Sequence, residues 1–129
     1  MTVSVRWDDP EHTILLYSLG GTWTWEELYE ASDKGLAMAA SVPHMIYVIV
    51  DYQSRHGLPP NAFGQFNRIN RLMTKQTALV IIVGGGTLLL SLFNLFLLIT
   101  GNSASKFCWV SDLDEAYKIC AARQVTSLS

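Results

Sequence analysis

Apolar and polar residues alternate along the first part of the chain. Every second residue of the segment 2–7 is apolar, which is the pattern of a strand with one buried face. A second apolar run follows over residues 12–19, after the turn-forming sequence Asp8-Asp9-Pro10-Glu11. The two runs therefore predict a β-hairpin.

Helical spacing replaces alternation after Gly20 and Gly21. Thr24 and Glu27 have the spacing of a capping box, in which a hydroxyl and a carboxylate satisfy the free N–H groups of a helix start. Apolar residues then recur at helical spacing as far as Ala40. We therefore expect a helix over residues 25–40.

Two continuous apolar runs come next. Residues 45–50 and residues 79–83 are apolar and rich in β-branched side chains, as strands covered on both faces usually are. Each run is followed by a segment that suits a helix. The first covers residues 59–73 and begins with two prolines, and the second covers residues 87–100.

The chain closes with a short apolar run over residues 106–110 and a capped helix from 113 to about 123. The predicted order is therefore β-β-α-β-α-β-α-β-α within a single α/β domain over residues 1–129. Strands that alternate with helices favour parallel crossovers. We expect a mixed sheet with helices packed on it and the opening hairpin as its antiparallel edge.

The segment 78–99 contains 22 residues without a charge, which is long enough to span a bilayer. Three consecutive glycines interrupt it at 84–86, and each glycine costs about 1 kcal/mol inside a helix relative to alanine. The composition also changes there from β-branched residues to leucine and phenylalanine. These features favour a buried strand followed by a helix in a soluble protein, with a membrane span as the alternative.

The predicted helix over 87–100 is apolar on nearly every side, because Thr87, Ser91 and Asn94 form one narrow polar stripe. One sheet covers only one side of a helix, and a large exposed apolar surface marks an association site. We therefore predict a self-association surface to which Leu89, Leu92, Phe93 and Phe96 contribute. The alternative is that the helix over 59–73 covers this surface.

Charge and cysteine content narrow the function classes. The chain has 9 basic and 11 acidic residues and a net charge of -2, which gives no electrostatic reason to expect a nucleic-acid partner. Its first residues form no apolar signal core, so we expect a cytoplasmic protein. In that compartment Cys108 and Cys120 would remain reduced, buried thiols.

Few residues form a group that could carry chemistry. Asp51, Ser54 and His56 supply the residue types of a catalytic triad, but one loop seldom gives them convergent geometry. His12, His44 and His56 are scattered, and none pairs with another at metal-ligand spacing. We therefore predict no catalytic residue and no metal site.

Two further motifs have both a functional and a structural interpretation. The glycines at 84–86 lie between a strand and a helix, as in a phosphate loop, but the remaining residues of such a loop are absent. Trp23 and Trp25 could line a ligand site, although aromatic residues at a helix start more often anchor a core. We predict no cofactor, and the structural interpretation is favoured for both motifs.

The sequences VPHMIYVIVDYQSRHGLPPNAFGQF (42–66) and FCWVSDLDEAYKIC (107–120), with the element order, resemble the STAS domain of anti-sigma-factor antagonists and SpoIIAA-like relatives. The resemblance implies a sheet flanked by helices and a role in protein–protein interaction. Some relatives bind lipids or small ligands. Asp51 matches the family pattern. The signalling members carry a phosphorylated serine at the start of the second helix, where residues 58–62 have no hydroxyl, so a phosphorylation switch is not expected.

These observations lead to one main hypothesis and two alternatives. The main hypothesis is a non-enzymatic, STAS-like interaction module that forms a homodimer or binds a protein partner. The first alternative is a carrier of a small apolar ligand or lipid, with a pocket beneath the helix over 87–100. The second is an enzyme that uses the loop from Asp51 to His56.

Overall fold

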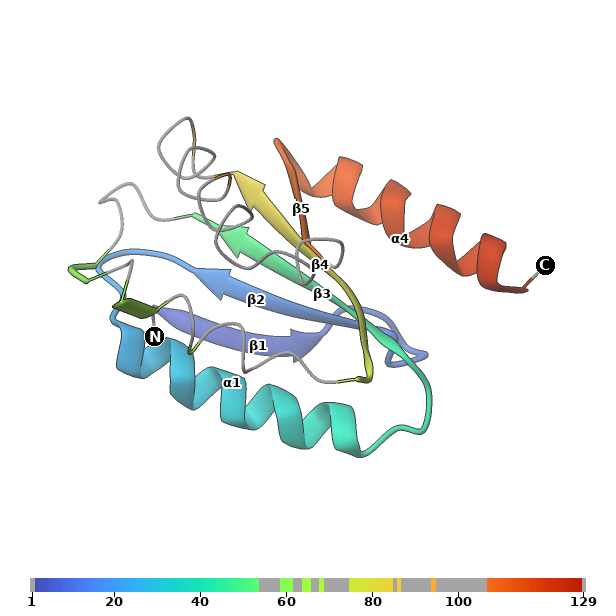
Figure 1. Ribbon diagram of the computed structural model, residues 1–129, viewed down its shortest axis with the longest axis horizontal. Coiled ribbons are helices and arrows are strands. Elements are labelled where there is room, and N and C mark those ends of the chain that lie inside the picture. The colour runs from blue at the N-terminus through green and yellow to red at the C-terminus, as the bar shows by residue number, and fades with distance from the viewer. Residues whose placement is uncertain are drawn as a thin grey trace.

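A five-stranded mixed sheet forms the centre of the protein (Figure 1). The computed structural model describes residues 2–53, 59–61, 64, 65, 68, 75–84, 86, 94 and 107–128, the last five of them by backbone alone. The strands lie across the sheet in their order along the chain: β1 (Val3–Trp7), β2 (Ile14–Leu19), β3 (Ile46–Tyr52), β4 (Thr77–Gly84) and β5 (Phe107–Val110). β1 is antiparallel to β2, and every other neighbouring pair is parallel. The predicted α/β class and mixed sheet are confirmed.

The predicted hairpin joins β1 to β2 through a tightly bonded turn. One carboxylate oxygen of Asp9 accepts hydrogen bonds from the backbone N–H groups of Thr13 and Ile14, each at 2.9 Å. His12 has a φ of 56°, a left-handed backbone conformation that residues other than glycine seldom adopt. Its ring stacks on Trp7, with ring centroids 4.7 Å apart.

Two helices lie in the described part of the chain, α1 (Trp25–Ala40) and α4 (Leu113–Leu128). The predicted capping box at α1 is confirmed. The Glu27 backbone N–H donates to the Thr24 hydroxyl at 3.2 Å, and the Glu27 carboxylate accepts from the Thr24 backbone N–H at 3.1 Å. At α4, the Asp112 carboxylate accepts from the Glu115 backbone N–H at 2.9 Å. The backbone of α4 stays helical beyond residue 123, where the sequence pattern ends.

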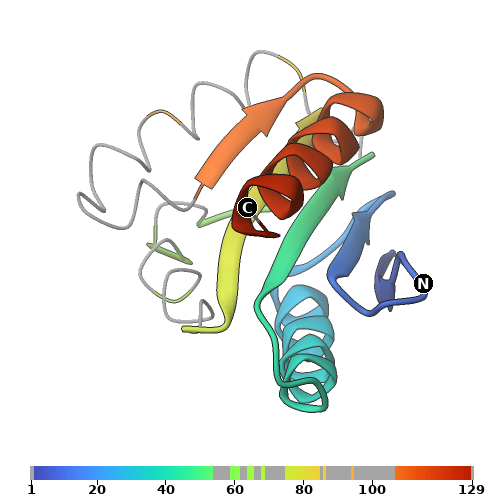
Figure 2. The same ribbon diagram turned by 90° about the vertical axis from the view of Figure 1, so that its right-hand side faces the viewer.

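The two helices cover opposite faces of the sheet (Figure 2). α1 packs on β1, and α4 packs on β3, β4 and β5. We name the two sides the α1 face and the α4 face. The core of the α1 face contains Val3, Val5, Leu15, Tyr17, Leu19, Trp23, Ala31, Ala39, Ile46 and Tyr52. The core of the α4 face contains Ile14, Leu16, Tyr47, Ile49, Leu79, Ile81, Val83, Val110, Ala116 and Cys120.

The end of α1 is tied to the start of β4 through one side chain. The amide nitrogen of Gln76 lies 2.6 Å from the carbonyl oxygen of Ala39, 2.9 Å from that of Val42 and 2.9 Å from that of His44. Carbonyl groups in the last turn of a helix have no partner within the helix. Ala39 also accepts from the Val42 backbone N–H at 3.2 Å, and Gln76 adds a donor from a distant part of the sequence to Ala39 and to the two carbonyls that follow α1.

The first part of the uncharged segment 78–99 is a strand, as the sequence predicts. β4 lies between β3 and β5, and Ile81 at its centre is fully buried. Gly84 ends the strand with a φ of +80°, and a Cβ at that position would lie 3.1 Å from the backbone oxygen of Tyr52. No helix in the described part of the chain has both the length and the apolar character needed to cross a membrane.

The other two predicted helices lie almost entirely outside the described residues. Within 59–73, Gly64, Gln65 and Arg68 are helical, and within 87–100 Asn94 is helical and exposed. The full order of strands and helices predicted from the sequence is therefore not established. The predicted association residues Leu89, Leu92, Phe93 and Phe96 also lie outside the described residues.

Candidate functional site

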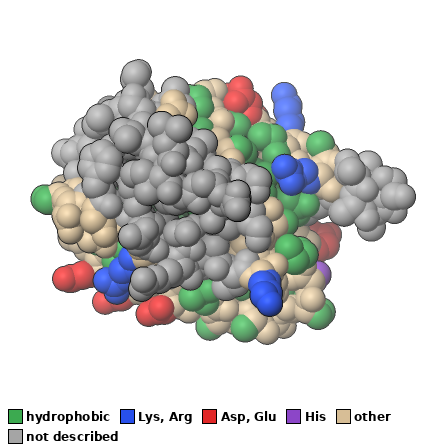
Figure 3. All heavy atoms as spheres, viewed as in Figure 1, with side chains coloured by type: hydrophobic (Ala, Val, Ile, Leu, Met, Phe, Trp, Pro, Cys, Tyr) green, Lys and Arg blue, Asp and Glu red, His purple; other side chains and the backbone are tan. Residues whose placement is uncertain are grey.

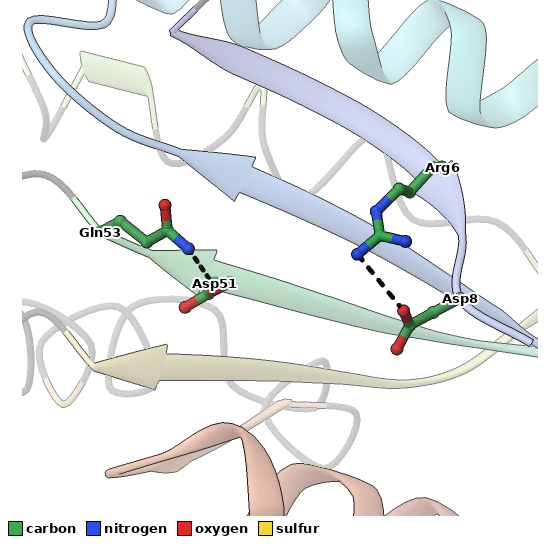
Figure 4. A network of polar contacts seen from close by, with 4 residues as sticks. All are labelled: Arg6, Asp8, Asp51 and Gln53. Atoms are coloured by element: carbon green, nitrogen blue, oxygen red, sulfur yellow. Dashed lines mark hydrogen bonds and ion pairs between the residues drawn. The ribbon is translucent and has the colours of Figure 1, made fainter.

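Asp51, the residue singled out by the sequence, lies on the α4 face of β3. The strand register places it beside Ser18 of β2 and Val83 of β4. Its side chain is buried, and one carboxylate oxygen accepts a hydrogen bond of 2.7 Å from the side-chain amide of Gln53 (Figure 4). The Gln53 backbone N–H donates to the Leu19 carbonyl at 2.7 Å. A buried carboxylate needs such a partner, because desolvation of an unpaired charge is costly.

A second polar group lies on the same face, nearer the hairpin turn. Arg6 of β1 is 3.6 Å from the carboxylate of Asp8 (Figure 4), with Arg6 largely exposed and Asp8 nearly buried. Tyr117 of α4 forms a hydrogen bond with Asp8. Asp8 follows β1 directly, so this group and Asp51 occupy different levels of the same sheet face.

The environment of Tyr117 keeps its hydroxyl protonated. Burial, the hydrogen bond to Asp8 and the negative charges of Asp8 and Asp51 raise the pKa of Tyr117 to about 12, against the opposing effect of Arg6. A phenol with a raised pKa acts as a hydrogen-bond donor at neutral pH rather than as a base. We call Arg6, Asp8, Asp51, Gln53 and Tyr117 the polar strip.

The side-chain contacts described above are made between members of the polar strip, and one of them, between Asp8 and Tyr117, joins the hairpin to α4. The Asp51 carboxylate is bonded to Gln53, and the Asp8 carboxylate is bonded to Tyr117 and paired with Arg6. Ser54 and His56, the other two members of the triad considered above, lie outside the described residues. Among the described residues, no three His, Cys, Asp or Glu side chains converge as metal ligands would.

Aromatic residues gather on the other face, near the start of α1. Trp23 belongs to the core and makes edge contacts with Trp25 and Tyr52, with ring centroids 4.8 and 6.0 Å apart. The indole N–H of Trp23 donates to the Tyr52 hydroxyl at 3.2 Å, and that of Trp25 donates to the Pro60 carbonyl at 2.8 Å. Trp23 is therefore a core anchor, as favoured from the sequence. Trp25 is half-buried and packs against the same core.

Tyr29 links α1 to the segment that follows β3, a contact that sequence spacing did not predict. Its hydroxyl donates a hydrogen bond to the side-chain oxygen of Gln65. The guanidinium carbon of Arg68 lies 3.8 Å from the centre of its ring, a cation–π arrangement. Burial raises the pKa of Tyr29, and the charge of Arg68 opposes that shift. Residues with no common periodicity meet here, so only the tertiary structure reveals the contact.

The glycines after β4 support the structural interpretation of that motif where they are described. Gly84 and Gly86 both have positive φ values, and the Gly84 carbonyl accepts a hydrogen bond of 2.9 Å from the indole of Trp109. Gly84 therefore allows the tight end of the strand that the sequence predicts. Gly85 lies outside the described residues.

Charged side chains of both signs are dispersed over the described part of the surface seen in Figure 3.

Comparison with known protein families, with curated proteins and with solved structures finds no match for this chain. The resemblance to STAS domains therefore remains a prediction from sequence patterns. The structure adds the five-stranded mixed sheet and the buried Asp51.

Proposed function

We propose that this chain is a non-enzymatic, STAS-like protein-interaction module that associates with itself through the apolar segment 87–100. The observation that carries the proposal is the division of the uncharged segment at Gly84. β4 uses residues 77–84 as a strand within the sheet. The leucines and phenylalanines that follow are thus a separate apolar segment, which the strand does not account for.

The residue types of the segment 87–100 predict one polar side and one apolar side. Thr87, Ser91 and Asn94 form its polar stripe, and Asn94 is exposed. Leu89, Leu92, Phe93 and Phe96 lie away from that stripe if the segment is helical. Burial of such residues against a second copy would stabilise the dimer by roughly 25 cal/mol for each Å² of apolar surface removed from water. Four large side chains would therefore form a substantial part of a dimer contact.

The proposal includes the full order β-β-α-β-α-β-α-β-α and a cytoplasmic location. Its support is the sequence pattern together with the described sheet, in which the opening hairpin supplies the antiparallel edge and the later strands are parallel. In this interpretation Asp51 has a structural role, since its carboxylate is buried and bonded to Gln53.

Size-exclusion chromatography with light scattering over a range of concentrations tests the proposal. We expect the wild-type chain to have the mass of a dimer, and Leu92→Lys and Phe96→Lys to have the mass of a monomer. Met45→Lys is the matched control, because Met45 is a large hydrophobic side chain that is already 49% exposed. A wild-type chain that remains monomeric at every concentration would overturn the proposal, whether or not the variants fold.

Native mass spectrometry of the same wild-type sample separates the module from the carrier. A dimer without added mass supports the interaction module. A monomer that retains an adduct of lipid size would contradict it and support a carrier of small apolar ligands.

A further inference from the structure

The two cysteines of the chain lie in the same packed layer, between β5 and α4. Cys108 is paired in register with Ile81, whose side chain belongs to the core of the α4 face, so Cys108 lies on that face. Cys120 is a member of the same core, and Cys108 packs against that core. α4 packs directly on β5. The fold therefore places two thiols that are twelve positions apart in the sequence in one packed layer.

The two thiols differ in their access to solvent. Cys120 is 1% exposed, whereas Cys108 is half-buried. A small oxidant would therefore meet Cys108 first, and Cys120 would be the second thiol to react. Both are free thiols in the structure, and each is placed by a regular element, β5 or α4.

One cation acts on both thiols. Burial raises the pKa of Cys108, and the guanidinium of Arg123 opposes that shift. Burial, the Cys108 thiol and the carboxylates of Asp9 and Asp8 raise the pKa of Cys120 to about 11, again opposed by Arg123. Tyr47 of β3 also faces this group, since Cys120 and Arg123 both influence its hydroxyl. A nearby cation favours the reactive thiolate, whereas burial suppresses it.

We propose that Cys108 and Cys120 are a redox-sensitive pair that closes to an intramolecular disulfide between β5 and α4 when a peroxide oxidises the protein. The Cys108 thiolate attacks one peroxide oxygen, which breaks the O–O bond, forms a sulfenic acid and releases water after protonation. The Cys120 thiolate then attacks the Cys108 sulfur, forms the S–S bond and releases a second water. The two thiols lose two electrons in total, and hydrogen peroxide is reduced to two molecules of water.

The disulfide would join the edge strand to the terminal helix and hold α4 on the sheet. Its formation is slow at neutral pH, because both thiols are mostly protonated there. Below the pKa of the attacking thiol, the thiolate fraction rises about tenfold for each pH unit, and the rate rises with it. This proposal does not depend on self-association, because both thiols belong to one chain.

Intact-mass measurement of the reduced full chain after treatment with hydrogen peroxide tests the pair. We expect a loss of about 2 Da per chain, resistance of both cysteines to alkylation, and reversal of both changes by a dithiol reductant. The reaction should be faster at pH 8.5 than at pH 7. Alkylation of both cysteines after peroxide treatment would overturn the proposal, as would disulfides formed only between two chains.

Four variants identify the residues that cause the loss of mass and set the rate of disulfide formation. Cys108→Ser and Cys120→Ser should each abolish the loss of about 2 Da. Arg123→Gln should slow disulfide formation several-fold, whereas Arg123→Lys should retain most of the wild-type rate, since it keeps the positive charge. Equal rates for Arg123→Gln and the wild type would contradict the role of the guanidinium. The wild-type mass measurement stands even if a variant does not fold.

Discussion

The α1 face and the α4 face belong to the same strands, yet they exclude water in different ways. On the α1 face, Val3, Val5 and Trp7 of β1 point toward α1, and close packing of aromatic and small residues fills the layer. On the α4 face, α4 packs on β3, β4 and β5, whereas Ser4 and Arg6 of β1 are exposed. β1 therefore has one buried face and one solvent-exposed face, as its alternating sequence predicts.

The two faces should be sensitive to different kinds of mutation. The α1 face depends on shape, because Gly35 of α1 lies directly against the hydroxyl of Tyr17. The α4 face combines an apolar core with the polar strip, in which the carboxylates of Asp51 and Asp8 have polar partners two residues away along the chain. A change of volume should therefore matter most on the α1 face. A change of hydrogen bonding or charge should matter most on the α4 face.

Gly35→Ala should have the largest effect of the following changes. A Cβ at this position would collide with the Tyr17 hydroxyl, and added volume in a packed layer costs about 1–3 kcal/mol, near the upper limit for such a short contact. Chemical denaturation should show the loss in the free energy of unfolding. Gly20→Ala is the control, since its nearest heavy atom is a flexible side-chain oxygen at 4.0 Å.

Removal of the hydroxyl in the double variant Gly35→Ala, Tyr17→Phe should recover part of that loss. The oxygen that makes the closest contact is then absent, although the ring carbon that carried it remains 3.0 Å from the new Cβ. Additive effects of the two substitutions would show that the collision is not the source of the destabilisation.

Alkaline pH should destabilise the protein through both faces. Burial raises the pKa of Tyr17 to about 12, against a hydrogen bond with Ser32, and the pKa of Tyr117 is also raised to about 12. Between about pH 10 and pH 12 the unfolded chain loses these protons first, so the free energy of unfolding falls as the pH rises. Below about pH 10 both states keep the protons, and this effect is absent.

Denaturation measured from pH 8 to pH 11.5 separates the two tyrosines. Tyr17→Phe and Tyr117→Phe should each make the alkaline decrease shallower than in the wild type. An unchanged slope in Tyr117→Phe would show that its hydroxyl is equally easy to ionise in the folded and unfolded states.

Asp51→Ala should have an intermediate effect of about 1 kcal/mol on the free energy of unfolding, because it removes the hydrogen bond with Gln53. A double-mutant cycle with Gln53→Ala isolates the interaction between the two side chains. We expect a coupling energy of about 0.5–1 kcal/mol. A coupling near zero would mean that the bond makes no net contribution to stability.

Arg6→Ala should have the smallest effect, at most about 0.5 kcal/mol, because an exposed ion pair contributes little to stability. Arg6 is 67% exposed, and its distance to Asp8 is 3.6 Å. Measurement in low and high salt should show a difference from the wild type that shrinks as salt is added. A loss above 1 kcal/mol would show that Arg6 also packs against the buried residues of β2.

The periodicity of the sequence predicted the strands and both described helices, because each has a strong local signal. The alternation of β1, the β-branched run of β3 and the capping box of α1 are all confirmed. Gly84 marks the end of β4, as its position in the apolar run suggested.

The contacts between distant segments could not be predicted in this way. Tyr29 and Arg68 share no period, and neither do Asp8 and Tyr117, because these pairs depend on how α1 and α4 lie on the sheet. Asp51 was selected from the sequence as a residue of interest, but its bond to Gln53 depends on a side-chain conformation. Spacing therefore predicts elements, and the tertiary structure decides which polar residues meet.

The contacts of Gln76 have a consequence for the order in which the chain folds. The carbonyl of Ala39 in the last turn of α1, and those of Val42 and His44 just after the helix, receive hydrogen bonds from a residue that is 32 to 37 positions later in the sequence. The last turn of α1 can therefore form early in folding, but it gains this stabilisation only when the start of β4 arrives beside β3. The end of the first helix and the start of the fourth strand therefore each add to the stability of the other.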